Sequence, residues 1–270
     1  MRTRPRAWET SRRWPPPERS PSWARSTPAI TSVPDALVIA GCLSGEKNDA
    51  GVAALVDELA AAVGAGAVLR ARTGGRPVGP AVPEALAELR ARGVRRALVV
   101  TTHVTNGRLQ REARFAVRAA FWGFDGLNLA PPLLSEEEDF AAVAAALDEA
   151  LPARPGLVVA LAGHRGAACE EAFARLEEAL SERGRADVLV DAPGHLSGRL
   201  ARRPERKVLL GPLLMALGHH ARHDVLVDLR EQLAAQGLTV STWPHALAEL
   251  PAVRALVVAH ALSFCPSGVV

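Results

Sequence analysis

The chain has 270 residues and a mass of 28.5 kDa, with 49% hydrophobic and 23% charged residues. This is the composition of a globular protein that is large enough to bury a substantial core. No apolar run reaches the roughly 20 residues needed to span a bilayer, and no secretory signal pattern opens the chain. The three cysteines form no CxxC pair, which argues against a disulfide framework and favours a reducing, cytoplasmic location.

Most of the positive charge lies in the first 34 residues. They hold seven arginines against Glu9 and Glu18, so their net charge of +5 leaves −2 for the rest of a chain that carries +3. Seven prolines and no hydrophobic periodicity predict that residues 1–34 form a disordered basic tail, and this stretch also fits an over-extended start of the reading frame. The remainder shows no recognised nucleic-acid-binding motif, so we expect neither a nucleic-acid partner nor a membrane partner.

Strand and helix patterns alternate from Asp35 onward. Short apolar runs predict buried strands, and a 3.6-residue hydrophobic period predicts the helices between them. The expected elements are strands at 35–41, 67–73 and 95–104, helices at 52–63, 82–93 and 108–122, an extended stretch at 126–134 and a helix at 135–151. Ser135 and Glu138 have the spacing of a capping box at the start of the last helix.

A proline-rich break, "PARPG" at 152–156, interrupts this order, which then begins again. The second series has strands at 157–163, 186–194, 206–216 and 238–243, and helices at 168–184, 195–204, 225–237 and about 250–262. Alternation of this kind requires parallel sheets covered by helices on both faces. We therefore predict an α/β protein with two similar halves, residues 35–153 and 154–270, and a cleft between them.

Histidines gather where the predicted strands end. The segment "LGHHARHD" at 217–224 follows an apolar strand, His103 closes the predicted strand 95–104, and His164 comes just after the strand 157–163. In open parallel sheets, ligands bind outside the carboxyl ends of the strands, so these positions favour a site. The alternative is that the cluster at 217–224 is a solvated loop or helix start.

Imidazole can bind a divalent metal or exchange a proton near neutral pH. Within the cluster, His219 and His223 are spaced i, i+4, so they would share a helix face, whereas His219 and His220 would diverge. No more than two of the three histidines should therefore point at one metal. The chain has no HExxH, GxSxG, GxxxxGK[ST] or GxGxxG motif, which argues against a zinc protease, acyl transfer and nucleotide chemistry.

Several segments together resemble the anaerobic sirohydrochlorin cobaltochelatases, class II enzymes that place a metal in a tetrapyrrole. They are "VVALAGHRG", "VLVDAPGH", "VLLGPLLMALGHHARHD" and "ALAELPAVRALVVAHA", with "THVTNGRLQ" and "PLLSEEEDF" in the first half. The resemblance covers residues 36–262 in consistent order and implies a chelatase-like fold. It implies insertion of Co²⁺, or alternatively Ni²⁺ or Fe²⁺, into a sirohydrochlorin-type tetrapyrrole in cobalamin-type biosynthesis.

The resemblance also assigns residues. His164 and His220 match the two metal-site histidines of the family and are the expected catalytic and metal-binding pair, and His223 is expected to add a metal ligand or base. The family has a carboxylate after the stretch matched by Gly107, where this chain reads Arg108-Leu109-Gln110. His219 and His223 stand where the family has aspartate and asparagine.

Arginines beside the matched motifs are candidates for binding the substrate carboxylates: Arg165, Arg108 and Arg222. Glu249 and His260 also match the family, but on a terminal helix we expect a structural role. Two alternatives stay open. One is a degenerate relative that binds tetrapyrrole or metal without insertion, and the other is a non-enzymatic metal-handling protein that uses His219 and His223. A homo-oligomer is compatible with all of these.

Overall fold

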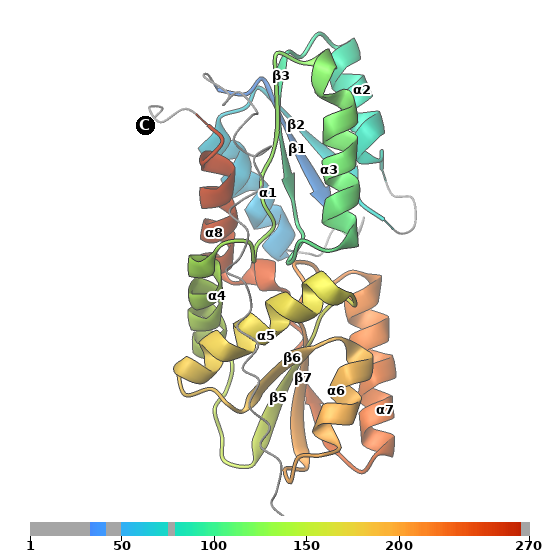
Figure 1. The fold of residues 1–270 in the computed structure, drawn as a ribbon, viewed down its shortest axis with the longest axis vertical. Coiled ribbons are helices and arrows are strands. Elements are labelled where there is room, and N and C mark those ends of the chain that lie inside the picture. The colour runs from blue at the N-terminus through green and yellow to red at the C-terminus, as the bar shows by residue number, and fades with distance from the viewer. Residues whose placement is uncertain (1–32, 42–49, 75–78, 266–270) are drawn as a thin grey trace, which may run out of the picture.

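A computed structural model of the chain describes residues 33–41, 50–74 and 79–265. Residues 1–32 of the predicted tail and Cys42 lie outside these ranges. The described chain forms two stacked α/β units, each built on a four-stranded parallel sheet (Figure 1). No helix of the described chain is both long and apolar enough to cross a bilayer.

The first sheet has the strand order β2-β1-β3-β4, with all neighbours parallel. Its strands are β1 (Ala36–Gly41), β2 (Ala67–Arg72), β3 (Arg96–Thr101) and β4 (Gly126–Leu129). The helices that follow them are α1 (Ala50–Val63), α2 (Val82–Ala91), α3 (Arg108–Ala120) with the short turn η2 (Phe121–Gly123), and α4 (Glu137–Ala150). Every residue of the central strand β1 is buried, which explains its unbroken apolar sequence.

The second sheet repeats this topology in the order β6-β5-β7-β8. Its strands are β5 (Leu157–Ala162), β6 (Val188–Asp191), β7 (Lys207–Pro212) and β8 (Thr239–Thr242). Its helical segments are α5 (Ala167–Glu182), α6 (Pro193–Leu200), the π-helix η3 (His220–Leu229), α7 (Arg230–Ala235), η4 (Leu247–Glu249) and α8 (Pro251–Leu262). The repeated strand order confirms the predicted pair of similar α/β halves.

One hydrophobic core runs through both units. It contains buried side chains from β1 and β3, from β5, and from α1, α4, α5 and α8, whereas each unit has a separate core on the opposite face of its sheet. Figure 1 shows α8 returning from the second unit to lie beside α1, with α4 beside α5. The two units are therefore held against each other by helices of both, and the boundary at 153/154 stays a prediction from sequence.

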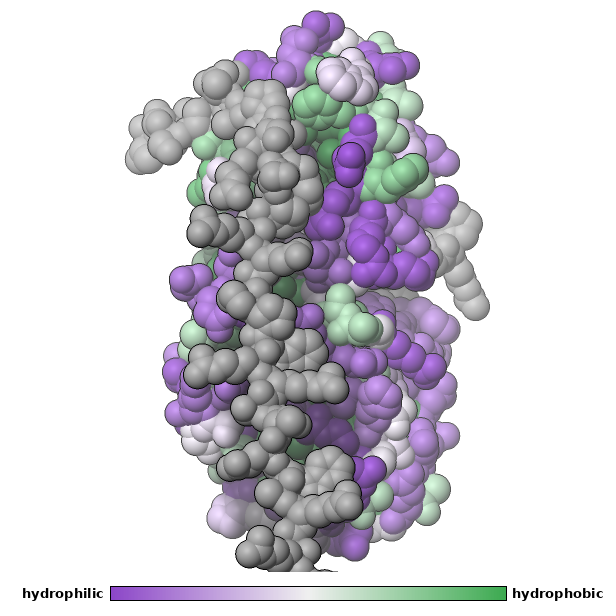
Figure 2. Space-filling view, viewed as in Figure 1, coloured by the Kyte–Doolittle hydropathy of each residue, from purple (hydrophilic) through white to green (hydrophobic). Residues whose placement is uncertain are grey.

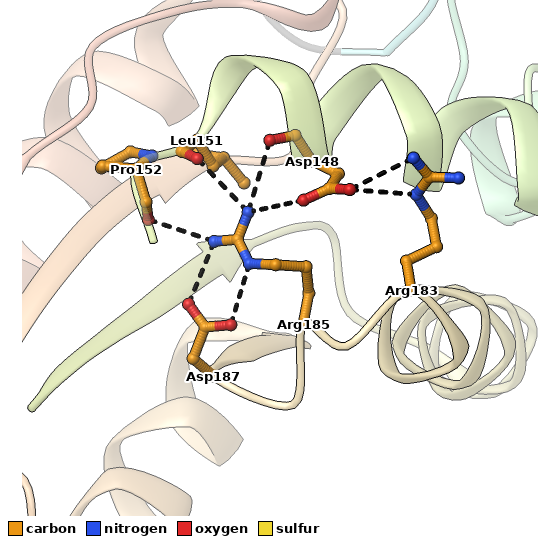
Figure 3. A network of polar contacts seen from close by, with 6 residues as sticks. All are labelled: Asp148, Leu151, Pro152, Arg183, Arg185 and Asp187. Carbon is orange, nitrogen blue, oxygen red and sulfur yellow. Dashed lines mark hydrogen bonds and ion pairs between the residues drawn. The ribbon is translucent and has the colours of Figure 1, made fainter. Parts of the chain in front are cut away.

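A buried arginine fastens the connection between the units (Figure 3). The Arg185 guanidinium, 5% exposed, makes two hydrogen bonds of 2.9 and 3.0 Å to Asp187 and one of 3.1 Å to Asp148 near the end of α4. It also donates to the carbonyls of Leu151 and Pro152, at 3.3 and 3.1 Å. The predicted break in the chain is therefore a connection held by one side chain of the second unit.

The helix α4 begins at Glu137, two residues later than predicted. The helix begins after Glu136, and Asp139, not Glu138, reaches back to accept hydrogen bonds from the backbone N–H groups of Ser135 and Glu136, at 2.8 and 2.7 Å. The expected capping box of Ser135 with Glu138 is therefore wrong. Asp139 is buried and also bonds His260 of α8, which a solvent-facing Glu138 could not do.

Candidate active site

The carboxyl end of β5 and the segment after β7 bring two histidines together. β5 and β7 are adjacent and parallel, so the chain leaves both strands at the same edge of the sheet. His164 lies two residues after β5, and His220 is the first residue of η3. Their imidazole rings are stacked, with centroids 4.8 Å apart and an interplanar angle of 10°. Residues far apart in the sequence therefore form one pair at this edge, as the location of ligand sites in parallel sheets predicts.

His220 is held by a carboxylate and presents one nitrogen without a partner. Its Nδ1 lies 2.5 Å from Oδ2 of Asp224, one turn later in η3. Its Nε2 is buried and makes no hydrogen bond among the described residues. A buried polar atom without a partner is costly, so a ligand that meets it gains correspondingly. An imidazole that donates Nδ1–H to a carboxylate and offers Nε2 is the usual arrangement of a metal-binding histidine.

His164 is neutral at physiological pH. Its ring reaches solvent but is surrounded on most sides by protein, and this burial lowers the pKa of His164 from 6.5 to about 4. This lowered pKa includes smaller contributions from positive charge on His220, His103 and Arg108, which the Asp224 carboxylate opposes. A neutral imidazole retains the lone pair that a metal ion or a proton needs.

The two stacked rings would have to change their relative orientation to bind one ion together. A ring nitrogen binds a metal within the plane of its ring, at about 2.1 Å. Two nearly parallel rings cannot both aim at one point between them, so at least one ring must turn. Because His164 lies in a loop and is exposed, it is the ring that can turn.

The third predicted metal residue, His223, lies with a different partner. Its ring is 4.3 Å from that of His219, with an interplanar angle of 31°. Within the described ranges, no group of three or more metal-binding side chains is close enough to enclose an ion. The structure thus groups the histidines as two pairs, His164 with His220 and His219 with His223.

The three predicted substrate-binding arginines are all exposed near these pairs. Arg108 opens α3 and forms an ion pair of 2.5 Å with Glu112. Arg222 donates from Nε to the carbonyl of Leu217, at 2.6 Å. Arg165 follows His164 directly. The closeness of Arg108 to His164, seen in its effect on the pKa of His164, places the first turn of α3 beside the histidine loop of the other unit.

A buried polar network beneath this place was not predicted. Both ring nitrogens of His103 have partners inside the first unit: Nδ1–H donates to Oε1 of Gln110 at 2.8 Å, and Nε2 accepts from the hydroxyl of Thr73 at 2.7 Å. Gln110 also accepts from Thr101 and donates to the carbonyl of Ala130. Burial lowers the pKa of His103, so this imidazole is neutral. Its position at a strand end was visible in the sequence, but its partners were not.

Both ring nitrogens of His103 thus have hydrogen-bond partners, so the role of His103 is structural. The network holds the conformation of the loop after β3, which faces the second unit. Further along that loop, Thr105 touches the thiol of Cys169 in α5, at 3.1 Å. Gly107 is packed so closely against the same thiol that a Cβ would lie 3.2 Å from it. The loop after β3 and the start of α5 thus meet beside His164.

Glu249 and His260, for which we expected a structural role, bond residues that hold the last helix in place. His260 bonds the buried Asp139 at 2.9 Å, so α8 is fixed to the start of α4. Glu249 bonds His245 at 2.7 Å and the backbone N–H of Ala246 at 2.8 Å, which closes the turn before α8. Neither residue contacts the His164–His220 pair.

Fold and site together define a two-unit α/β protein with a histidine pair at the edge of one parallel sheet. The chain belongs to the CbiK cobalt chelatase family, whose model matches residues 77–265. It is 27% identical over 195 residues to the sirohydrochlorin cobaltochelatase of Salmonella typhimurium. The match covers 66% of this chain and 71% of that protein.

Solved structures of chelatases share the fold. SirB from Bacillus subtilis with Fe³⁺ matches with a TM-score of 0.58 at 15% identity, over 85% of this chain and 95% of that one. SirB from Bacillus subtilis subspecies spizizenii in complex with cobalt matches with a TM-score of 0.59 at 15% identity, over 85% and 94%. CbiX, described as the terminal enzyme of siroheme biosynthesis in denitrifying bacteria, gives 0.53 at 21% identity, over 84% and 97%.

Proposed function

We propose that this protein inserts a divalent metal ion into sirohydrochlorin, with Co²⁺ as the first candidate and Ni²⁺ or Fe²⁺ as further ones. The observation that carries the proposal is the His164–His220 pair at a sheet edge, in a chain of the cobalt chelatase family. Cobalt comes first because the family and the curated relative are both named for cobalt. Imidazole itself suits Co, Ni and Fe(II), so the two ligands do not select among them.

The two histidines have different tasks in this reaction. Insertion exchanges one divalent ion for the two protons on the macrocycle nitrogens. Asp224 orients His220 and stabilises it when it becomes positively charged, so Nε2 of His220 can first hold the ion and then accept a proton as the ion leaves. His164 serves as the neutral ligand, and with its pKa lowered to about 4 it passes any proton on to water.

Sirohydrochlorin carries carboxylate side chains, and the three exposed arginines beside the histidines would bind them. Arg165 follows His164 directly, and Arg222 lies between His220 and His223. Arg108 would have to exchange its ion pair with Glu112 for a substrate carboxylate. We further propose a cytoplasmic location. We also propose that the reaction requires no nucleotide, because the chain contains none of the nucleotide-phosphate loop motifs.

Metal insertion can be followed by the change in tetrapyrrole absorbance. Purified protein should accelerate the change with sirohydrochlorin and Co²⁺ above the uncatalysed rate, and His164→Ala or His220→Ala should each reduce it at least tenfold. His195→Ala is the matched control, because His195 is an exposed histidine of the same sheet edge that bonds Asp191. No acceleration with Co²⁺, Ni²⁺ or Fe²⁺ would overturn the proposal.

A relative that binds the tetrapyrrole without inserting metal is the second candidate. It is favoured by the residues at the place of the family carboxylate: Arg108 is a cation, Leu109 is apolar, and Gln110 is a buried neutral amide. Such a protein would change the absorbance of sirohydrochlorin on mixing, but it would show no turnover when metal is added.

A further inference from the structure

The His219–His223 pair is separate from the proposed insertion site. His219 has helical backbone angles at the start of η3, and the hydrogen bond of 3.0 Å from Arg222 N–H to the Gly218 carbonyl continues this turn. One turn of helix therefore places the two imidazoles on the same face, with ring centroids 4.3 Å apart. Both side chains are exposed.

These two histidines differ from most others in having no polar partner. All eight histidines lie in the described part of the chain. Five of them bond a carboxylate, an amide or a hydroxyl: His103, His195, His220, His245 and His260. Within the described residues, the side chains of His164, His219 and His223 make no hydrogen bond or ion pair, so no polar contact fixes the rings of His219 and His223, which touch each other.

We infer that His219 and His223 form a second site, which captures a divalent cation from solution. Two histidines at i and i+4 on one helix face are the ligand spacing of zinc-binding helices. Two imidazoles with water completing the coordination suit ions such as Co²⁺, Ni²⁺ and Zn²⁺. The rings are free to turn until their lone pairs converge, and the carboxylate of Asp224, 49% exposed, offsets the positive end of the helix.

The position of this site suggests what the captured ion is for, and this step rests on the proposed function. His219 adjoins His220 in the chain, and His223 adjoins Asp224, whose carboxylate bonds His220. One turn at the start of η3 therefore holds both histidines of the outer pair and His220 of the inner pair. An ion that leaves the exposed pair meets the half-buried His220 next, so the outer pair raises the local concentration of metal at the insertion site.

The site itself is tested with Co²⁺ alone, by equilibrium dialysis of the full chain and by the visible absorption of bound Co²⁺. The wild-type protein should bind one ion more than the double variant His219→Ala/His223→Ala. The control His195→Ala should bind as much as the wild type, and circular dichroism should show that all variants are folded. Equal Co²⁺ binding by the wild type and the double variant would overturn the site.

The capture role is tested by the insertion rate as a function of Co²⁺ concentration. The double variant should need several-fold more Co²⁺ for half-maximal rate, whereas the control His195→Ala should need as much as the wild type. Equal Co²⁺ dependence would refute capture while the binding site stands. If the wild type inserts no metal but the double variant still loses Co²⁺ binding, the proposed function fails and the second site does not.

Discussion

Replacement of Arg185 by methionine tests whether the connection between the two units depends on one buried cation. Methionine keeps most of the apolar stem but removes the donor to Asp187, to Asp148 and to three carbonyls, and leaves Asp148 with Arg183 alone. Breaking a buried ion pair typically costs about 3–5 kcal/mol. Because Asp148 and Asp187 are 28% and 26% exposed, water can reach both after the change. We therefore expect a loss of about 3 kcal/mol in the free energy of unfolding, at the lower end of that range.

The assay is equilibrium unfolding in urea. With a slope of about 3 kcal/mol per molar, appropriate to a large domain, the midpoint should fall by about 1 M. Arg183→Met is the matched control, since Arg183 is 40% exposed and also pairs with Asp148. An exposed pair of this kind contributes at most about 1 kcal/mol. If the two variants were equally stable, the buried arginine would not be what fastens the connection.

Three further predictions concern the site. Asp224→Asn should lower the insertion rate about tenfold with little change in folding, because an amide still accepts from His220 but carries no charge to stabilise it; an unchanged rate would argue against the proton-accepting role. Gln110→Leu should lower the free energy of unfolding by about 2–3 kcal/mol, measured in urea, because His103 loses its buried acceptor; an unaltered midpoint would contradict this. The pKa of His164 is lowered to about 4, so between pH 6.5 and 4 the unfolded chain binds a proton that the folded chain does not. The free energy of unfolding should therefore fall as the pH falls through this window. His164→Asn should remove that part of the loss.

The succession of strands and helices was predictable because both sheets are parallel. Strands such as β1 and β5 lie between two layers of helices and are apolar along their whole length, which makes them visible in a single sequence. The outer strand β8 alternates between exposed and half-buried residues, as expected at an edge. The helix that carries the histidines was expected from Val225 but begins at His220, because its first turn is polar and gives no apolar period.

The pairing of the histidines could be predicted only in part. The i, i+4 spacing of His219 and His223 was sufficient to place them on one face, since a single helical turn brings them together. The resemblance to the chelatases matched His164 and His220 as metal-site histidines. Their stacking, the bond to Asp224 and the buried Nε2 required the three-dimensional structure.

The sequence by itself determined the layered α/β architecture, the duplication and the edge of the sheet at which a site must lie, because hydrophobic period and strand direction are local properties of the chain. Only the tertiary structure decided that Asp139 holds His260, that Gln110 holds His103 and that Arg185 holds the connection between the units. These contacts join residues of different elements, and each depends on burial that removes water as the competing partner. No local pattern carries that information, because it arises only when separate elements of the chain pack against each other.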